Sequence, residues 1–182
     1  MKVKLTNVRL AFPVLFEAKT VNGEGKPAFS ASFLLDPADH QVKALNQAIE
    51  QVAKDKWGAK AEAILKQMRA QDKVALHDGD LKANYDGFPG NLYVSARSAT
   101  RPLVIDKDKS PLTEQDGKPY AGCFVNASIE LWPQDNNYGK RVNASLRGVQ
   151  FFRDGDAFAG GGAASEDEFD DISSGATADD LV

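Results

Sequence analysis

Arginine and aromatic side chains fall on the same faces of segments that are predicted to be β-strands. Tyr93 and Arg97 are four positions apart, and Arg141 and Arg147 are six positions apart. Residues an even number of positions apart in a strand point to the same side of a sheet. Cations attract phosphates and aromatic rings stack on bases, and neither contact reads a base sequence. The pattern therefore predicts sequence-independent binding of a single-stranded nucleic acid.

We predict that cationic and aromatic residues on strands and loops form the nucleic-acid contact. The predicted residues are Tyr93, Arg97, Arg101, Tyr120, Phe124, Tyr138, Lys140, Arg141 and Arg147. The aromatic members are expected to include at least two that stack on bases, and the arginines are expected to contact phosphates or to stack. The competing interpretation is that Phe124, and also Trp132, packs at the edge of the core while the charges only face solvent.

Charge is unevenly distributed along the chain. The 182 residues contain 26 acids and 22 bases, a net charge of −4. Nine of the acids lie between Asp154 and Asp180, where there is no Lys or Arg, so residues 1–153 carry a net charge of +5. A basic body with an acidic tail is typical of proteins that bind nucleic acids or other anions. A solubilising tail on a neutral enzyme would give the same distribution.

Residues that commonly carry catalysis or bind metals are scarce. The chain has two histidines, His40 and His77, and one cysteine, Cys123, which are too few for a common structural zinc site. There is no Gly-x-Ser-x-Gly motif, and the Asp-rich turns lack the spacing of a calcium loop. We therefore predict a non-enzymatic protein without cofactor or metal. The lone cysteine and the lack of a signal peptide or a long apolar segment predict a cytoplasmic protein.

The elements that must position these residues are mainly β-strands. Residues 3–16 are rich in β-formers and are interrupted by Pro13, and residues 28–35 are expected to form a second strand. Residues 21–27 contain glycines and a proline and are expected to form a turn or loop. The two strands are therefore expected to pair as a hairpin.

A helical insertion is expected over about residues 37–71. Asp36 and Pro37 form a typical helix start, with an acidic N-cap and a proline in the first turn. Apolar residues then recur at helical spacing. Gly58 is expected to end the first helix, and residues 59–71 are expected to form a second one.

Alternation of apolar and polar residues is clearest in the last third of the chain. Residues 121–131 and 141–152 both alternate, and the turn formers over 133–139 between them predict a long hairpin with one buried face. Residues 91–98 and 102–105 add two shorter strands. Strands so far apart do not form regular βαβ units, and a closed antiparallel barrel would hide their edges. We predict a mainly β fold of five or six strands, although periodicity alone does not separate an oligonucleotide-binding (OB) barrel from a sandwich.

The C-terminal residues are expected to lie outside the folded domain, which is predicted over residues 1–158. Residues 159–182 begin with a Gly- and Ala-rich linker and continue as an acidic stretch. Its few apolar residues cannot offset the entropy of ordering, so a flexible linker and a disordered tail are predicted. Such a tail can mimic a polyanion and occupy the protein's own basic groove, and its apolar residues can dock to a partner protein. The predicted partner-binding residues are Phe169, Asp179, Asp180, Leu181 and Val182.

Several segments resemble a family of bacteriophage single-stranded DNA-binding proteins. The resemblance rests on Asn7–Pro13, Phe33–Asp36, Pro119–Ala127 and Asn137–Phe151. It implies an OB-fold with a helical insertion, similar to the replication-type binding proteins of podovirus-like phages. It also implies roles in phage DNA replication, recombination and repair in the host bacterial cytoplasm. The tail matches the family from Glu166 onward, but it ends in Leu181-Val182, where many such tails end in an aromatic residue.

Two other functions remain open at this point. The same barrel could bind RNA or anneal complementary strands, which relative affinities for RNA and DNA and an annealing assay would separate. An accessory or structural phage protein could instead use the tail only for docking, and would bind no nucleic acid at low salt. The sequence also leaves open the oligomeric state, the length of nucleic acid bound, and which phage or host replication proteins are partners.

Overall fold

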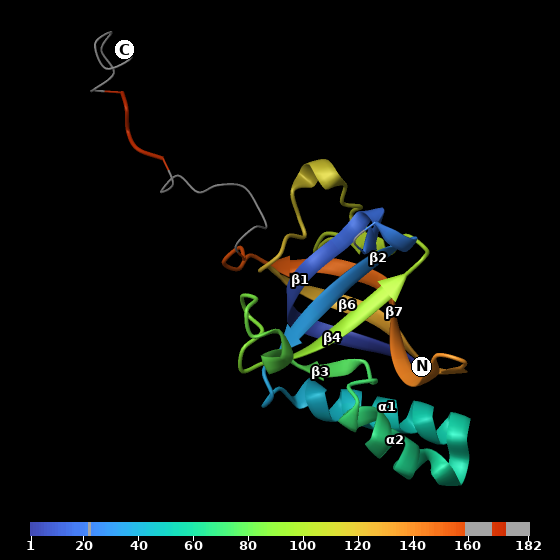
Figure 1. Ribbon diagram of the computed structural model, residues 1–182. Helices are drawn as coiled ribbons and strands as arrows, with labels where there is room; N and C mark the ends of the chain where they lie inside the picture. Colours follow the sequence, from blue (N-terminus) through green and yellow to red (C-terminus); the bar gives the residue numbers. More distant parts are fainter. Residues whose placement is uncertain (22, 159–168, 174–182) are drawn as a thin grey trace.

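The computed structural model describes residues 1–21, 23–158 and 169–173. Five strands form a closed barrel: β1 (Lys2–Val21), β2 (Glu24–Leu35), β4 (Leu92–Ser98), β6 (Phe124–Asn136) and β7 (Gly139–Arg153). Around the barrel the order is β1-β2-β4-β7-β6; β4 and β7 pair in parallel, and the other neighbours are antiparallel. β3 (Leu76–Asp78), which Figure 1 shows beside β4, and β5 (Leu103–Ile105), which pairs with β7, extend the sheet beyond the barrel. The prediction of a mainly β, OB-like barrel is confirmed.

The barrel interior is filled in part by the alternating apolar residues from which the C-terminal hairpin was predicted. Val125, Ala127, Ile129 and Leu131 of β6 are buried, and the residues that alternate with them, from Phe124 to Glu130, are partly exposed. β7 alternates in the same way up to Leu146, and its phase shifts at Arg147 and Gly148, where its register with β6 is irregular. The hairpin is longer than predicted, since Pro133 to Asn136 pair with β7 and the predicted turn over 133–139 shrinks to two residues.

The helical insertion consists of α1 (His40–Trp57), a short 3-10 turn η1 (Gly58–Lys60) and α2 (Ala61–Ala70). Both helices lie at the end of the barrel next to β3 (Figure 1). The prediction of Asp36 as the N-cap is wrong. Asp36 accepts from the backbone N–H of Ala38 in a preceding turn, and Asp39 caps the helix by accepting from Gln41 N at 2.9 Å. The pattern of acid followed by proline marks that turn, one step before the helix begins.

The N-terminal hairpin also extends beyond its predicted bounds. β1 does not end at Phe16 but continues to Val21, where it pairs with Glu24, and at the predicted break around Pro13 its register with β2 shifts between Ala11 and Val14. The expected loop over 21–27 is therefore mostly strand. β3 was not predicted at all, because three residues are too few to establish an alternating pattern. Within the described residues, no helix is long and apolar enough to cross a membrane.

Candidate nucleic-acid interface

A groove of ≈ 620 Å³ lies on the outside of the barrel where β4 meets β7. Its polar and aromatic lining includes His77, Ser95, Arg97, Trp132, Arg141 and Asn143. None of the described residues that line it is acidic. Cationic, aromatic, hydroxyl and amide groups are thus gathered in one groove, which is a composition suited to phosphates and bases.

Strand pairing brings two of the predicted arginines, Arg97 and Arg141, to this groove. Arg97 is in register with Ser145 across the parallel pair of β4 and β7. Arg141 lies four positions before Ser145, and therefore on the same face of β7. Arg97 Nη2 donates to the Lys26 carbonyl at 3.2 Å, whereas Arg141 makes no hydrogen bond or ion pair with any residue that the structure describes. Both guanidinium groups keep N–H donors for a phosphate.

Trp132 is the aromatic residue of the groove. It lies on β6 opposite Asn143 of β7 and is 41% exposed. Beside it, the Asn143 amide donates to Gln134 Oε1 at 2.9 Å. Sequence reasoning left Trp132 out of the predicted set. The signal was present, however, because Trp132 is in phase with the polar face that begins at Phe124.

Three further predicted residues lie on the β6–β7 hairpin, outside the lining of the groove. Arg147 Nη1 donates to Glu130 at 3.1 Å, and Lys140 Nζ lies 3.7 Å from Asp135. Tyr138 is at the tip of the hairpin and is 87% exposed. Both ion pairs are partly exposed, and exposed pairs contribute little stability, so these cations are available to phosphates. Their contact with nucleic acid stays a prediction.

Tyr93 shares the outer face of β4 with Arg97, as its spacing predicted, but its ring is covered. It is 4% exposed. The ring stacks on His77 at 4.8 Å and meets Phe88 edge-on at 5.1 Å. Burial, with a smaller effect of Asp72, raises the pKa of Tyr93. In this arrangement the ring has no free face for a base, so its predicted stacking role is not supported by its position.

Tyr120 and Arg101 also make internal contacts. The Tyr120 hydroxyl donates to Asp154 at 2.7 Å, and burial, followed by this hydrogen bond, raises the pKa of Tyr120. Arg101 donates to the carbonyl of Phe16. The structure does not bring either residue into the groove, and their contact with nucleic acid stays a prediction.

Phe124 lies at the start of β6, away from the groove. The Arg153 guanidinium lies 3.6 Å from the centre of its ring, and the Arg9 guanidinium lies 5.8 Å from it. These are cation–π distances. Phe124 is therefore already engaged by the protein's own arginines.

Residues 154–158, which we call the strap, leave β7 and cross the outer face of β1. Arg9 Nη2 donates to the Asp156 carbonyl at 2.7 Å and its guanidinium lies 4.3 Å from the Phe158 ring centre. The Phe158 amide donates to the Ala121 carbonyl at 3.0 Å. Of the predicted tail residues, Phe169 is 72% exposed. Asp179, Asp180, Leu181 and Val182, together with most of the predicted linker and tail, lie outside the described residues.

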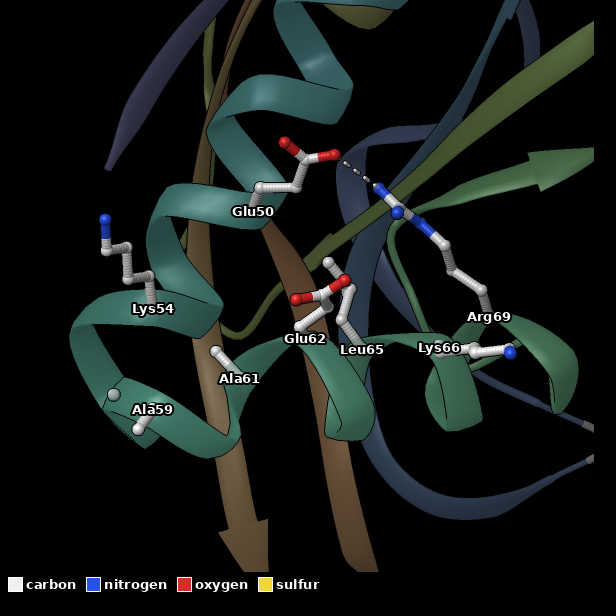
Figure 2. A pocket seen from close by; sticks show the side chains of 9 residues that line it. Glu50, Lys54, Ala59, Ala61, Glu62, Leu65, Lys66 and Arg69 are labelled. Atoms are coloured by element: carbon white, nitrogen blue, oxygen red, sulfur yellow. Dashed lines mark ion pairs between the residues drawn. The ribbon is translucent and has the colours of Figure 1, made fainter.

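Another cavity, of ≈ 680 Å³, lies between α1 and α2 (Figure 2). Its lining mixes acids and bases, namely Glu50, Glu62, Lys54, Lys66 and Arg69. Arg69 pairs with Glu50 at 3.7 Å, as Figure 2 shows. A lining of both signs does not attract a polyanion, so the groove between β4 and β7 is the better candidate.

The described residues offer little catalytic chemistry. Cys123 is buried, and burial raises the pKa of its thiol to about 11, so it stays protonated near neutral pH. His77 Nδ1 lies 2.6 Å from Asp72 in an internal pair. Over residues 1–21, 23–158 and 169–173, no group of three or more His, Cys, Asp or Glu could hold a metal ion.

Comparisons with known proteins identify the family of this chain. The whole chain, residues 1–182, matches the family described as Enterobacter phage Enc34, ssDNA-binding protein. The chain is 53% identical over 176 residues to protein p50 of Acyrthosiphon pisum secondary endosymbiont phage 1, with 95% of each covered.

Two solved structures have folds similar to that of this chain. The single-stranded DNA-binding protein from bacteriophage Enc34, in complex with ssDNA, has a TM-score of 0.73 and 27% identity, covering 87% of this chain and 89% of that chain. Gp2.5, a single-stranded DNA-binding protein encoded by bacteriophage T7, has a TM-score of 0.56 and 14% identity over 98% of this chain and 97% of that chain, and so shares the fold. Since the family match spans the entire sequence, the protein belongs to the Enc34 family of phage single-stranded DNA-binding proteins.

Proposed function

We propose that this protein binds single-stranded DNA along the groove between β4 and β7, without sequence preference and without catalysis. The observation that carries the proposal is the meeting of Arg97, Arg141 and the partly exposed Trp132 in one groove whose described lining has no acid. The Enc34 relative, which is 27% identical, was solved in complex with ssDNA, and this supports the proposal.

Each group in the groove has a distinct part in binding. The guanidinium groups of Arg97 and Arg141 donate hydrogen bonds to phosphate oxygens and attract the backbone. The Trp132 ring stacks on a base, and Ser95 and Asn143 supply neutral hydrogen-bonding groups. Every nucleotide has a phosphate and an aromatic face, so none of these contacts selects a base.

We further infer that the protein serves phage DNA replication, recombination and repair, and that its acidic tail regulates it. The strap ends on the outer face of β1, so the seven acids from Glu166 to Asp180 come after a segment that is attached to the barrel surface. They compete with DNA for the protein's own arginines and lysines. When DNA displaces the tail, Phe169 and the final Leu181-Val182 become available to replication or recombination proteins of the phage or host.

Titration of a fluorescent oligonucleotide at several salt concentrations tests the proposal. We expect binding to DNA of unrelated sequences with similar affinity, and a linear fall of log K with log salt of roughly 0.7 per phosphate contacted. An RNA of the same sequence is the second arm. Tighter binding to RNA, or rapid annealing of complementary strands, would favour the alternative function of an RNA-binding or annealing module. Absence of binding at low salt would refute the proposal.

A further inference from the structure

A cluster of aromatic residues outside the groove is partly open to solvent. It consists of Phe12, Tyr85, Phe88 and Tyr93, and we call it the aromatic platform. Tyr93 and Phe88 are its buried base, at 4% and 0% exposure. Phe12 and Tyr85 form its outer layer, at 46% and 45% exposure, with ring centres 5.0 Å apart and planes at 88°.

The platform is separate from the barrel core. Its buried members pack with Ala11 and Leu34 in a cluster distinct from the one inside the barrel. Phe88 contacts the outer ring of Phe12 at 5.7 Å. The rings are therefore stacked outward from the surface of β1, β2 and β4, and the two exposed ones are not needed to fill the barrel.

The backbone of Phe12 is held in an unusual conformation that turns this ring outward. Its φ is 48°, and it lies where the register of β1 shifts between Ala11 and Val14. A positive φ is uncommon for a bulky residue, and such strain is concentrated at functional sites. The bulge interrupts the alternation of β1 and leaves an aromatic ring on the outside of the sheet.

The platform also has a cation close to it. Lys82 Nζ lies 6.0 Å from the centre of the Phe12 ring, 5.9 Å from that of Phe88 and 5.2 Å from that of Tyr93. Lys82 can therefore contact a phosphate beside a base that rests on the rings.

The platform continues from the groove. His77 lines the groove and stacks on Tyr93, the base of the platform. Arg97 lies four positions further along β4 on the same face as Tyr93, or roughly 13 Å at the rise of a strand. One extended strand of nucleic acid can therefore contact both places.

We propose that Phe12 and Tyr85 form a second base-stacking site for single-stranded DNA, reached by a strand that already occupies the groove. This inference rests on the proposed function, because the groove supplies the first contact. The occupant is a nucleobase of the same bound strand. The exposed aromatic faces, the cation beside them and the continuity through His77 and Tyr93 all fit that occupant.

The test compares a short and a long oligothymidylate, of about 4 and about 16 nucleotides, which span the range of site sizes for OB folds. The variant is Phe12→Leu with Tyr85→Leu, which keeps apolar bulk but removes both aromatic faces. The matched control is Phe152→Leu, which changes an aromatic residue of similar exposure, 40%, elsewhere on the barrel. Thermal unfolding of each variant verifies that the fold is kept.

We expect the double variant to bind the long oligonucleotide roughly 5- to 150-fold more weakly for each base that no longer stacks. The short oligonucleotide should bind as it does to the unchanged protein. Photocrosslinking of an iodouracil-substituted long strand should also label Tyr85. Unchanged affinity for the long strand, or an equal reduction for both lengths, would overturn the second site.

A parallel Trp132→Ala variant separates this inference from the proposed function. If Trp132→Ala lowers the affinity for both oligonucleotides while the platform variant lowers the affinity for neither, the groove binds DNA and the second site is refuted. If Trp132→Ala changes the affinity for neither oligonucleotide, the assignment of the groove as the DNA-binding site is wrong, whatever the affinity of the platform variant.

Discussion

The indole N–H of Trp57, at the end of α1, donates to Asp135 Oδ2 of the β6–β7 hairpin at 3.0 Å. Lys140 Nζ lies 3.7 Å from the other carboxylate oxygen of Asp135. Close by, the Val142 amide donates to the Lys73 carbonyl, just after α2, at 3.1 Å. The helical insertion thus holds the hairpin that carries Trp132 and one wall of the groove.

The contact between Trp57 and Asp135 should loosen in acid. The indole hydrogen bond, and then the charge of Lys140, lower the pKa of Asp135 from its ordinary value of 3.8. Because the pKa is lower in the folded state, the stabilisation is present above 3.8 and is lost as the pH falls through the folded-state pKa. In a Trp132→Phe background, Trp57 fluorescence should change with a midpoint below 3.8. Adding Asp135→Asn should remove that transition, and a transition that persists in this variant would contradict the assignment.

Replacing Arg97 or Arg141 by alanine should reduce the salt dependence of DNA binding. If each arginine neutralises one phosphate, each variant lowers the slope of log K against log salt by roughly 0.7. Oligonucleotide titrations from low to moderate salt give the slope. Arg69→Ala, in the mixed-charge cavity between the helices, is the control and should leave the slope unchanged. If all three variants had the same slope as the unchanged protein, Arg97 and Arg141 would not contact phosphates.

Trp132 and Tyr93 should respond differently to alanine. Trp132→Ala should weaken DNA binding by roughly 1–3 kcal/mol with little change in unfolding, because the side chain is partly exposed. Tyr93→Ala should lower the free energy of unfolding by about 3 kcal/mol or more, since the buried ring leaves a cavity. Urea unfolding and oligonucleotide titration measure the two effects. Normal stability with reduced affinity for Tyr93→Ala would restore Tyr93 as a stacking residue.

Truncation after Ala159 should tighten DNA binding at low salt. The truncated chain keeps the strap but lacks seven of the nine C-terminal acids, and screening weakens their competition as salt rises. The difference in affinity between the two proteins should therefore shrink with salt. Substitution of the same seven acids by their amides in the full chain is the matched control. Equal affinity of the truncated and full-length proteins for DNA at low salt would exclude autoinhibition. If the truncated protein then only failed to bind replication or recombination proteins, the tail would serve for docking alone.

The sequence predicted the parts of the fold that repeat a pattern. The alternation through Val125 and Leu131 predicted the hairpin and its buried face, and Gly58 predicted the break between the helices. The groove could not be predicted in the same way, because it depends on the parallel pairing of Arg97 with Ser145, residues far apart in sequence. Phe12 was missed for a local reason, since its outward ring depends on a bulge with a positive φ.

The parallel pairing that closes the barrel has a consequence for its motion. In the described chain, Arg97 with Ser145 is the one register pair between β4 and β7, whereas β6 and β7 pair along their whole length. Backbone amides beside so short a pairing are expected to open locally at a smaller free energy than global unfolding requires. Hydrogen exchange should therefore be faster along β4 facing β7 than in the centre of β6. A DNA strand bound across β4 and β7 would hold the two strands together. Hydrogen exchange of the β4 amides should therefore become slower when DNA binds, although the fold stays the same.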